Sequence, residues 1–567
     1  MTNIRNKNGI AMAVTLMFMV ILVGTSGIFV LRSAQENKEA RAERDMAEAS
    51  LAAQGGNQKA LQQLDVLIND YLRNTIASAN PSGVISSASN KVSSGDGIGW
   101  LLNAVRYNNS PVLSQNGEQA EYSANGSMGQ GSYQYMIIMT EKTDPVAVGS
   151  DAWDFPYSYR LQTTGTAGGA ANSIMLSGDF TVRVQKDNFA KFALFTNTQS
   201  TPTGDEVWFT NKTNFAGPVH TNDRFNFALN PSGTFEDVAS QEEQKARFYN
   251  MGSPVLLNAD ANGSHDAPVF HNGFNRNAGT ISLNLSTQQQ DVADQALGGQ
   301  TFGTDGIYIP NNGTDLNGGI YVKGNASSIL LSVSGNNQVY TLTQGSTTIR
   351  VTTDAANNQT TVEDVGAGTS QTYTGLPDGL DDSGTIIHVD GKIGSLSGTV
   401  ESNSTVTVSG KNDIKITNNL VYSDYTPAVG NPGDAGYIPP SATGTNNLLG
   451  MVSWEGDIRI GTGAPDDIQV HGTVLAQNGI FQVDNYDDSG VGPRGTATLL
   501  GGVVTDNYGA FGLFNGFTGA QISGYGRNFI YDQRMLVGAA PPYFPTLNTF
   551  IAFANDITDR MVWQEGE

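Results

Sequence analysis

The apolar residues divide this chain into a helical beginning and a long strand-forming remainder. Residues 10–31 form an uncharged run, and a helix of that length spans about 33 Å, close to the hydrocarbon thickness of a bilayer. Apolar residues then recur at helical spacing, at Leu61, Leu64, Ile68, Tyr71 and Leu72. We therefore expect one long helix over residues 10–78, apolar first and amphipathic later, with a kink at Gly55-Gly56.

Charged residues directly after the apolar run support the continuation of this helix. Opposite charges lie four residues apart in the pairs Arg32/Glu36, Arg41/Asp45 and Arg44/Glu48. Each such pair stabilises an exposed helix by roughly 0.2–0.5 kcal/mol. The pattern predicts that the helix continues beyond a membrane into water.

Strand-like runs follow a Ser-, Asn- and Gly-rich stretch over residues 80–130, which we expect to be a surface loop. The runs are Tyr133–Thr140, Tyr157–Thr163, Ile174–Ser177, Phe180–Gln185 and Phe192–Thr196. Phe180, Val182 and Val184 alternate with polar residues, which is the period of a half-buried strand. One face of these strands is expected to pack against the apolar stripe of the helix.

Beyond about residue 200, short β-prone runs alternate with Gly, Asn and Asp, and we expect no further helix. Examples are residues 319–324, 385–390, 404–409, 413–417 and 467–472. This spacing suits a β-solenoid, in which each coil buries its apolar face by stacking on its neighbours. A β-sandwich is the rival fold, but the strands are very short and the repeats only loosely similar, which favours the solenoid. Residues 339–343 and 348–352 are expected to form a hairpin through Gln344-Gly345-Ser346.

Composition agrees with a fold that is mainly β with one long N-terminal α-helix, since the chain has 67 glycines and only 15% charged residues. It contains no cysteine, which excludes a disulfide framework and a thiolate metal site. Its 53 acidic and 30 basic residues give a formal charge of −23. Because binding to nucleic-acid phosphates needs Lys and Arg, the overall field repels DNA, although a local basic patch remains compatible with it.

A short basic leader precedes the apolar run and sets its orientation. Arg5 and Lys7 place the leader in the cytoplasm by the positive-inside rule, with the rest of the chain outside. A cleaved secretory signal would have a shorter apolar region that ends in small residues, whereas this run exits into Leu31-Arg32. We expect a single-pass inner-membrane protein with an extracytoplasmic bulk.

Lys7-Asn8-Gly9 followed by the apolar run from Ile10 resembles the start of type IV pilins and their type II secretion relatives. The resemblance implies that a prepilin peptidase cuts between Gly9 and Ile10 and leaves a leader of residues 1–9. It also implies that the apolar half-helix (10–31) anchors the subunit and later packs in a filament core. Val14 departs from the Glu usual at that position, as in large minor pilins of the PilX and GspK kinds. An uncleaved signal anchor is the alternative.

Five segments, residues 215–222, 468–481, 495–504, 524–534 and 541–545, resemble the extracellular region of the large ComZ-type competence minor pilins. The layout of the whole chain is similar to theirs, while the middle matches only in texture. The resemblance implies a role in pilus assembly and in DNA binding and uptake during natural transformation.

The same resemblance implies a domain order for the rest of the chain. A pilin-like α+β region over residues 79–200 would pack the long helix on a small antiparallel sheet. A β-solenoid over residues 201–545 would be inserted in that sheet, and residues 546–567 would return to it.

Enzymatic chemistry is not expected. Asp381-Asp382 and Asp487-Asp488 each precede Ser-Gly, which suits solvated turn residues. Pectate-lyase-like β-helix enzymes also cluster carboxylates, and calcium in such a loop stays open. The five histidines show no HExxH spacing, a nucleotide-binding G-x-x-x-x-G-K-[ST] loop is absent, and His220 is expected to make a structural hydrogen bond. We assign no catalytic residue, metal ligand or cofactor.

Two stretches mix basic and aromatic residues in a way that combines base stacking with phosphate contact. The first contains Tyr525, Arg527, Phe529, Tyr531 and Arg534, and the second contains Lys212 and Arg224 among Trp208, Phe209, Phe225 and Phe227. The alternative for both is a set of core aromatics covered by arginine side chains. Any DNA binding is expected to be weak and to be lost as salt rises.

These features together predict a minor pilin at or near the tip of a type IV pilus. In the family, the Glu that Val14 replaces compensates the N-terminal amine of the neighbouring subunit, and a tip subunit has no subunit above it. A bulky solenoid is also hard to repeat along a filament. Other pilins, prepilin peptidase, the inner membrane and weakly bound DNA are the expected partners. A pilus-displayed adhesin for a surface or carbohydrate ligand, or a type II secretion pseudopilin, are the alternatives.

Overall fold

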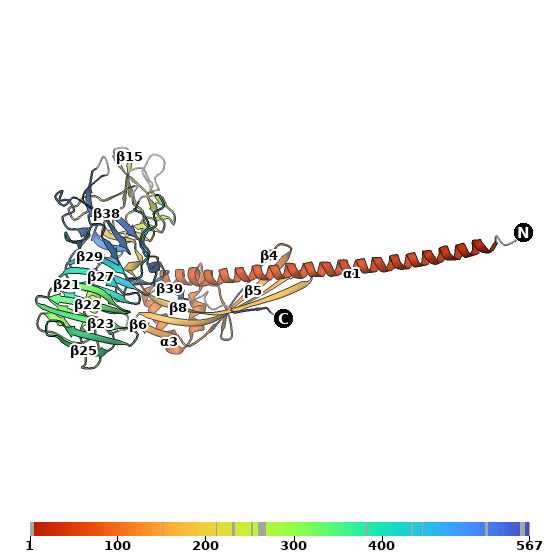
Figure 1. Cartoon of the computed structure of the whole chain (residues 1–567), viewed down its shortest axis with the longest axis horizontal. Coiled ribbons are helices and arrows are strands. Elements are labelled where there is room, and N and C mark those ends of the chain that lie inside the picture. Colours follow the sequence, from red (N-terminus) through yellow and green to blue (C-terminus); the bar gives the residue numbers. More distant parts are fainter. Residues whose placement is uncertain are drawn as a thin grey trace. The chain divides into compact units, whose positions relative to one another are not determined.

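The computed structural model describes residues 5–149, 151–210, 213–228, 233–250, 253–258, 268–380, 384–432, 435–444, 446–515, 520–555 and 562–565. Two compact units make up the chain (Figure 1). Unit 1 comprises Met1–Lys186 and Asn548–Glu567, and unit 2 comprises Asp187–Leu547. The chain is mainly β, with one long N-terminal helix, as the sequence predicts.

The N-terminal helix of unit 1 is continuous and longer than its apolar run. α1 spans Arg5–Asp65 and continues as a π-helical segment, Val66–Leu72, and then as α2, Arg73–Ser78. Helical hydrogen bonding passes through Gly55 and Gly56 without a break. A Cβ at Gly56 would overlap the ring of Tyr133 and the methyl group of Thr163. The glycines therefore let the sheet approach the helix closely, and the expected kink is not needed to explain them.

The sheet of unit 1 packs on the second half of this helix (Figure 1). Its order is β3-β4-β5-β7-β8-β39, with β6 beside β7 and β40 beside β8. The strands are β3 Ser114–Asn116, β4 Gln119–Met128, β5 Gly131–Glu141, β6 Val146–Gly149, β7 Ala152–Ala167, β8 Ala170–Asn188, β39 Thr546–Asn555 and β40 Val562–Glu565. Neighbours from β3 to β8 pair antiparallel.

The core between helix and sheet follows the periodicity of the sequence. Leu64, Ile68 and Leu72 of the helical segment are fully buried, and they share a cluster with Phe180, Val182 and Val184 of β8. Two runs expected as separate strands, 174–177 and 180–185, belong to this one strand. The expectation that alternating residues of the strands face the helical stripe is confirmed.

The expected surface loop over residues 80–130 is wrong, since this stretch contains two helices and several strands. α3 spans Pro81–Ser94 and α4 spans Gly97–Ala104, followed by the hairpin of β1 Arg106–Tyr107 and β2 Ser110–Pro111, and by β3 and β4. Asn80 caps α3 by accepting the N–H of Ser82, and Gly95 ends it in the left-handed conformation. Caps at both ends compensate for a Ser- and Asn-rich sequence of low helical propensity.

Unit 2 contains a large sheet in which strands stack mostly in parallel. Its order is β18-β14-β11-β9-β36-β33-β30-β28-β26-β20-β19, and of the pairs given only β19 with β20 is antiparallel. The strands are β9 Leu194–Thr198, β11 Val219–Thr221, β14 Ala239–Gln241, β18 Phe274–Asn275, β19 Gly306–Tyr308, β20 Ile320–Lys323, β26 Thr385–Asp390, β28 Thr405–Gly410, β30 Leu448–Ser453, β33 Thr473–Ala476 and β36 Val503–Asn507.

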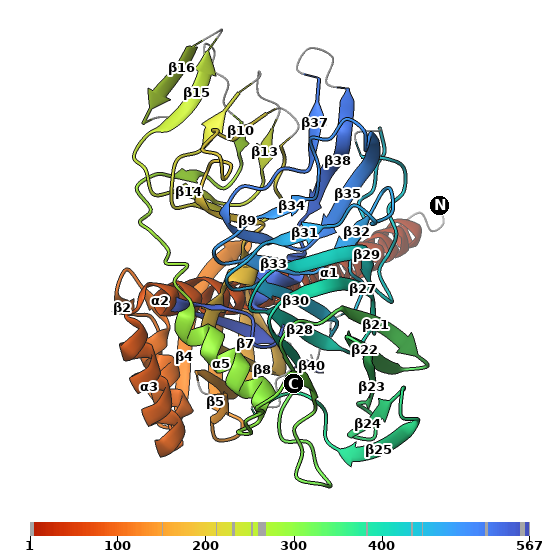
Figure 2. The same ribbon diagram turned by 90° about the vertical axis from the view of Figure 1, so that its left-hand side faces the viewer.

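A second large sheet contains the strands that come between those of the first sheet in the sequence, so from β20 to β38 the chain passes repeatedly from one sheet to the other (Figure 2). Its parallel part is β21-β27-β29-β32-β35-β38, and β31 and β34 pair beside β29. The strands are β21 Ser328–Ser334, β27 Ile393–Val400, β29 Ile414–Tyr422, β31 Ile458–Ile460, β32 Gln469–His471, β34 Phe481–Val483, β35 Pro493–Leu500 and β38 Gln521–Ile530. β37, Gly512–Phe514, adds to β38 antiparallel.

Antiparallel strands extend the second sheet at β21. They are β22 Asn337–Gln344, β23 Thr347–Asp354, β24 Gln359–Asp364 and β25 Thr369–Thr374. Gln344 pairs with Thr347 across the turn, so the hairpin expected through Gln344-Gly345-Ser346 is confirmed.

Short strands form two further small sheets in unit 2. One has the order β10-β12-β15-β16 and the other pairs β13 with β17. Their bounds are β10 Trp208–Phe209, β12 Asn226–Phe227, β13 Thr234–Phe235, β15 Ala246–Asn250, β16 Ser253–Leu257 and β17 Val269–Phe270.

In the described part of the region where the sequence indicated no helix, one α-helix and a short 3₁₀ helix, Gln533–Val537, are present. α5 spans Ser286–Leu297, with Val292 and Ala296 buried and Gly298 ending it in the left-handed conformation. Only a narrow apolar stripe marks it, because glutamine and aspartate occupy most of its surface positions. The expectation of an all-strand region after residue 200 is therefore wrong at this helix.

In the large parallel sheet, the strand that comes first in the sequence, β9, pairs with the strand that comes last, β36, with Leu194 opposite Val503. A row of side-chain hydrogen bonds crosses this junction. Asn197 donates to Asp506 at 2.8 Å and accepts from Asn222 at 3.0 Å. Near the ends of unit 2, the N–H of Phe189 donates to the carbonyl of Pro545 at 3.0 Å. Its entry and exit segments thus lie side by side.

Candidate functional site

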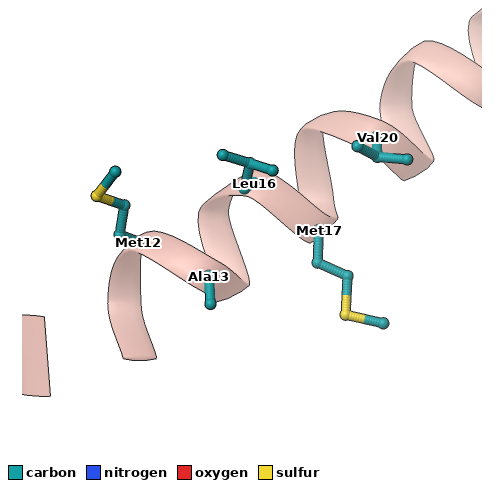
Figure 3. A pocket seen from close by; sticks show the side chains of 5 residues that line it. All are labelled: Met12, Ala13, Leu16, Met17 and Val20. Atoms are coloured by element: carbon teal, nitrogen blue, oxygen red, sulfur yellow. The ribbon is translucent and has the colours of Figure 1, made fainter. Parts of the chain in front are cut away.

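The first half of α1 exposes apolar side chains along its whole length. Ile10 is 64% exposed, Phe29 77% and Leu31 72%. Figure 3 shows Met12, Leu16 and Val20 in one row and Ala13 and Met17 in another, which is the four-residue spacing of a helix face. A single helix that keeps this much apolar surface in water is strongly disfavoured. This surface is consistent with a helix that is covered by lipid or by other apolar helices.

Both threonine hydroxyls within the apolar half-helix are satisfied internally. The hydroxyl of Thr15 donates to the carbonyl of Ala11 at 2.7 Å, and that of Thr25 donates to the carbonyl of Ile21 at 2.9 Å. These two side chains therefore need no water, which suits a helix in hydrocarbon. By length and composition this helix qualifies as a candidate membrane span.

The charged segment after the apolar run is also exposed. Arg32 contacts Glu36 at 3.3 Å and Arg44 contacts Glu48 at 3.8 Å, as the sequence predicts. Asp45 contacts Arg44 at 3.1 Å. Such exposed pairs add little stability, but alternating charges keep this segment soluble.

The predicted processing site lies on helical backbone. Residues 5–9, with Arg5, Lys7 and Gly9, belong to α1, and nothing is described of their side chains. Ile10 is exposed, and Val14 is 50% exposed on the helix surface.

Most predicted contact residues of unit 2 are engaged inside the fold. The guanidinium of Arg534 contacts the carboxylate of Asp532 at 2.6 Å, and Asp532 is only 3% exposed. Arg534 also donates to Gly444 O and Asn447 Oδ1, each at 2.7 Å. It therefore fastens the segment before β30 to the segment after β38. Asp532 lies only two residues before Arg534 in the sequence. This spacing is the feature from which the ion pair could have been predicted.

The aromatic members of the same stretch are core residues. Tyr525 is fully buried and donates to the carbonyl of Pro465 at 2.8 Å. Tyr531 donates to Lys191 O at 2.7 Å, and burial raises its pKa. Phe529 packs edge-on against Phe511. Tyr525 and Tyr531 are therefore not available to stack on a base, whereas Phe529 is only partly buried.

Arg527 is the exception. Its side chain is exposed, with the guanidinium 4.8 Å from the ring centre of Tyr508 and bonded to the Tyr508 hydroxyl. Arg224, from the second predicted patch, contacts Glu243 at 2.8 Å. Lys212 lies outside the described residues. Among the described basic residues of the predicted set, Arg527 is therefore the exposed one.

The acidic surplus is concentrated in unit 2. It holds 34 of the chain's 53 acidic residues but 15 of its 30 basic residues. Many of these cations already contact a carboxylate, as Lys415 does with Asp484 at 2.8 Å. Unit 2 therefore presents a predominantly anionic surface.

Three histidines of unit 2 are buried. The Nδ1 atom of His220 lies 2.8 Å from Ser240 Oγ, and that of His388 lies 3.0 Å from Ser409 Oγ. Burial lowers the pKa of His220, lowers that of His388 to about 4 and lowers that of His471 to about 3. His271 is exposed 3.7 Å from Glu236, and His265 lies outside the described residues.

The acidic turns show ordinary turn contacts where they are described. Asp488 accepts the N–H of Gly490 at 2.8 Å. Asp381 and Asp382 lie outside the described residues. Among the residues that are described, His, Asp and Glu side chains form no group of three able to share a metal ion.

Comparisons with known proteins are sparse. A family described as a domain of unknown function, DUF4900, matches residues 154–240, from β7 to β14. No curated protein matches the chain. Among solved structures, the competence-associated pilin ComZ from Thermus thermophilus is 12% identical, with 92% of this chain and 98% of that chain covered and a TM-score of 0.27. At a TM-score this low, the likeness supports no conclusion about function.

Proposed function

We propose that this chain is a membrane-anchored, pilin-like minor subunit of a type IV filament. The observation that carries the proposal is α1, in which one unbroken helix has a fully exposed apolar half and a second half buried against a sheet. The exposed half suits a bilayer before assembly and a bundle of like helices after it. The buried half fixes the sheet rigidly to that anchor.

Processing at Gly9/Ile10 is the first test of this proposal. The chain is expressed with a prepilin peptidase, and the N-terminus of the membrane-bound protein is read by mass spectrometry. We expect it to begin at Ile10, and we expect Gly9→Leu to retain residues 1–9 while the matched variant Asn8→Ala is still cut. A wild-type protein that keeps Met1 would identify an uncleaved signal anchor and refute the proposal.

Location on the filament tests the minor, tip-proximal role. Val14 lacks the carboxylate that would neutralise a neighbouring N-terminal amine, which favours a position with no subunit above it. Gold labelling of unit 2 on sheared filaments is expected to mark ends. Even labelling along the filaments would contradict the tip assignment.

We also infer that the two large sheets of unit 2 are the faces of a β-solenoid. The support is the repeated passage of the chain between them, with parallel pairing from β26 to β36 in one and from β27 to β38 in the other. Each coil then buries its apolar face against the next.

DNA uptake is the finer role that we propose for this subunit, with Arg527 as a contact. Phosphate binding through so few cations on an anionic unit should be weak and salt-sensitive. Titration of the full chain with duplex DNA should show binding only at low salt and a loss with Arg527→Ala. Arg350→Ala is the matched control, because Arg350 is 44% exposed and is already neutralised by Glu363 at 2.7 Å. No binding at low salt would remove the DNA role.

Adhesion is the second candidate, and the acidic surplus of unit 2 is the observation that favours it. An anionic surface suits a cationic or uncharged ligand, such as a solid surface or a carbohydrate, better than a polyanion. Deletion of the gene distinguishes the roles: lost transformation supports DNA uptake, lost attachment supports adhesion, and lost protein export supports a secretion pseudopilin. The proposed subunit is not an enzyme under any of the three.

A further inference from the structure

Strands β22 to β25 continue the second sheet of unit 2 beyond β21 (Figure 2). Cross-strand pairs define three rows of side chains on one side of these five strands, and the rows begin at Ser328, Leu330 and Ser332 of β21. The opposite side belongs to the core, where Tyr340 and Val351 are fully buried. The side with the three rows is named the hydroxyl face here.

Most side chains of the hydroxyl face are serine or threonine. Hydroxyl groups belong to nine of its 13 residues, and the longest uninterrupted run is Thr352, Thr361 and Thr372 on three adjacent strands. Thr372 is exposed, and Thr352 and Thr361 are half-buried. Neighbouring strands lie about 4.8 Å apart and alternate residues of a strand about 7 Å apart. The hydroxyls therefore form a two-dimensional array.

These hydroxyls keep hydrogen-bonding capacity for an outside partner. Thr361 Oγ1 lies 3.0 Å from Thr372 Oγ1, and Thr343 Oγ1 lies 3.3 Å from Thr348 Oγ1. Each hydroxyl has one proton to donate and two lone pairs to accept with. One bond between two hydroxyls thus leaves a proton and several lone pairs, so that each pair can still both donate and accept.

The hydroxyl face carries no net charge, in contrast to the unit to which it belongs. Its charged members are Arg350 and Glu363, which contact each other at 2.7 Å, whereas unit 2 has 34 acidic and 15 basic residues. Threonine is common in strands because of its β propensity. Propensity does not remove charged residues from an exposed sheet, however, and protein surfaces ordinarily carry many of them. The neutrality of this face is therefore a property that strand formation does not explain.

The chemistry of the hydroxyl face discriminates between classes of partner. A polyanion finds no free cation there, because Arg350 is already paired with Glu363. A protein partner requires an apolar centre, but Val339 is only 7% exposed, which leaves Leu330, at 44%, as the apolar side chain that the face presents. Closely spaced groups that both donate and accept match the hydroxyls of a sugar chain. The threonine methyl groups and Leu330 suit the apolar faces of sugar rings.

We propose that the hydroxyl face binds an uncharged polysaccharide. The proposal names the ligand class of the adhesion role and rests on that role for its biological use. An extended polysaccharide contacts several rows at once, so that bonds which are weak singly add to a stable attachment.

Sedimentation of the full chain in detergent with insoluble cellulose, chitin and mannan tests the binding. The wild type should bind at least one of them, and binding should not change with salt because no charges are screened. The triple variant Thr352→Val, Thr361→Val and Thr372→Val should bind at least tenfold more weakly. Its melting temperature should be unchanged, since valine has a similar size and β propensity. Serine at the same three positions keeps the hydroxyls and should retain binding.

The control removes an exposed hydroxyl pair elsewhere. Thr164→Val with Ser173→Ala deletes the pair that lies 3.0 Å apart in unit 1, and binding should stay at the wild-type level. No binding to any of the three polysaccharides, loss of binding as salt rises, or equal binding by the valine and serine variants would overturn the proposal. Cells that carry the valine variant and still attach, although the purified variant no longer binds, would refute the adhesion role and leave the hydroxyl face as a binding surface.

Discussion

Protonation of His388 is expected to destabilise unit 2 as the pH falls. His388 lies on β26, is 3% exposed and shares the hydroxyl of Ser409 with the indole N–H of Trp454, which donates to it at 2.8 Å. Desolvation lowers its pKa from 6.5 to about 4, while the nearby Asp390 and Lys411 act in opposite directions. The neutral imidazole is therefore the form that the fold accommodates.

The sign and size of the effect follow from proton linkage. Between its unfolded pKa of 6.5 and its folded pKa of about 4, the unfolded chain binds more protons at His388 than the folded chain does. Stability is fully present above the unfolded value and is lost as the pH falls through this window. The whole shift corresponds to about 3 kcal/mol, of which about 2 kcal/mol is lost between about pH 7 and about pH 5.

Urea unfolding followed by pulse proteolysis of unit 2, at these two pH values, measures the loss. Because carboxylates and other histidines also titrate, the informative quantity is the difference between the wild type and His388→Gln. The variant should lose about 2 kcal/mol less than the wild type over this range. His271→Gln is the control, because His271 is exposed. An identical pH dependence of the wild type and His388→Gln would refute the reasoning.

Three other substitutions test the packing. Gly165→Ala places a Cβ against the α1 backbone at Ala49, so the free energy of unfolding of unit 1, measured in urea, should fall by about 1–3 kcal/mol. Gly83→Ala is the control and should not destabilise unit 1, because nothing lies within 4 Å of a Cβ at that position. Arg534→Ala leaves the carboxylate of Asp532 buried and unpaired, and should cost unit 2 about 3–5 kcal/mol by pulse proteolysis. Asn197→Ala removes the side-chain hydrogen bonds to Asp506 and Asn222 at the β9–β36 junction. Amide hydrogen exchange, compared with the wild type, should accelerate more in β9 than in β26.

The elements that sequence reasoning identified are those whose pattern is carried by large apolar residues. Phe180, Val182 and Val184 alternate without exception, and they are buried against the helix. The hairpin through Gly345 has a turn residue between two β-prone runs, so local chemistry alone specifies it. Such elements need no knowledge of their neighbours.

The missed helices depend on caps and neighbours. α3 buries only Val84 and Ala88, and α5 buries only Val292 and Ala296, so neither shows a wide apolar face. Short helices of this kind are held by tertiary packing more than by propensity. A one-dimensional pattern therefore reads them as loop.

The candidate contact residues also show that a sequence pattern does not specify the partners of a side chain. Alternating Arg and Tyr describe an exposed binding strip and a buried ion pair equally well, and only the three-dimensional partners separate the two. Arg534 is bound to Asp532 and to the backbone carbonyl of Gly444, whereas Arg527 on the preceding strand is exposed.

The two units differ in net charge, and this difference predicts how their contacts depend on salt. Unit 1 is close to neutral, whereas unit 2 carries a formal charge of −19, from 34 acidic and 15 basic residues. Contacts made by the apolar half of α1 should change little with salt, since there are few charges to screen. Contacts made by unit 2 with a charged ligand should change steeply with salt. Measuring self-association and ligand binding over the same salt series thus separates the two surfaces without any substitution, and a self-association that falls with salt as steeply as ligand binding would contradict the assignment of the two roles to different units.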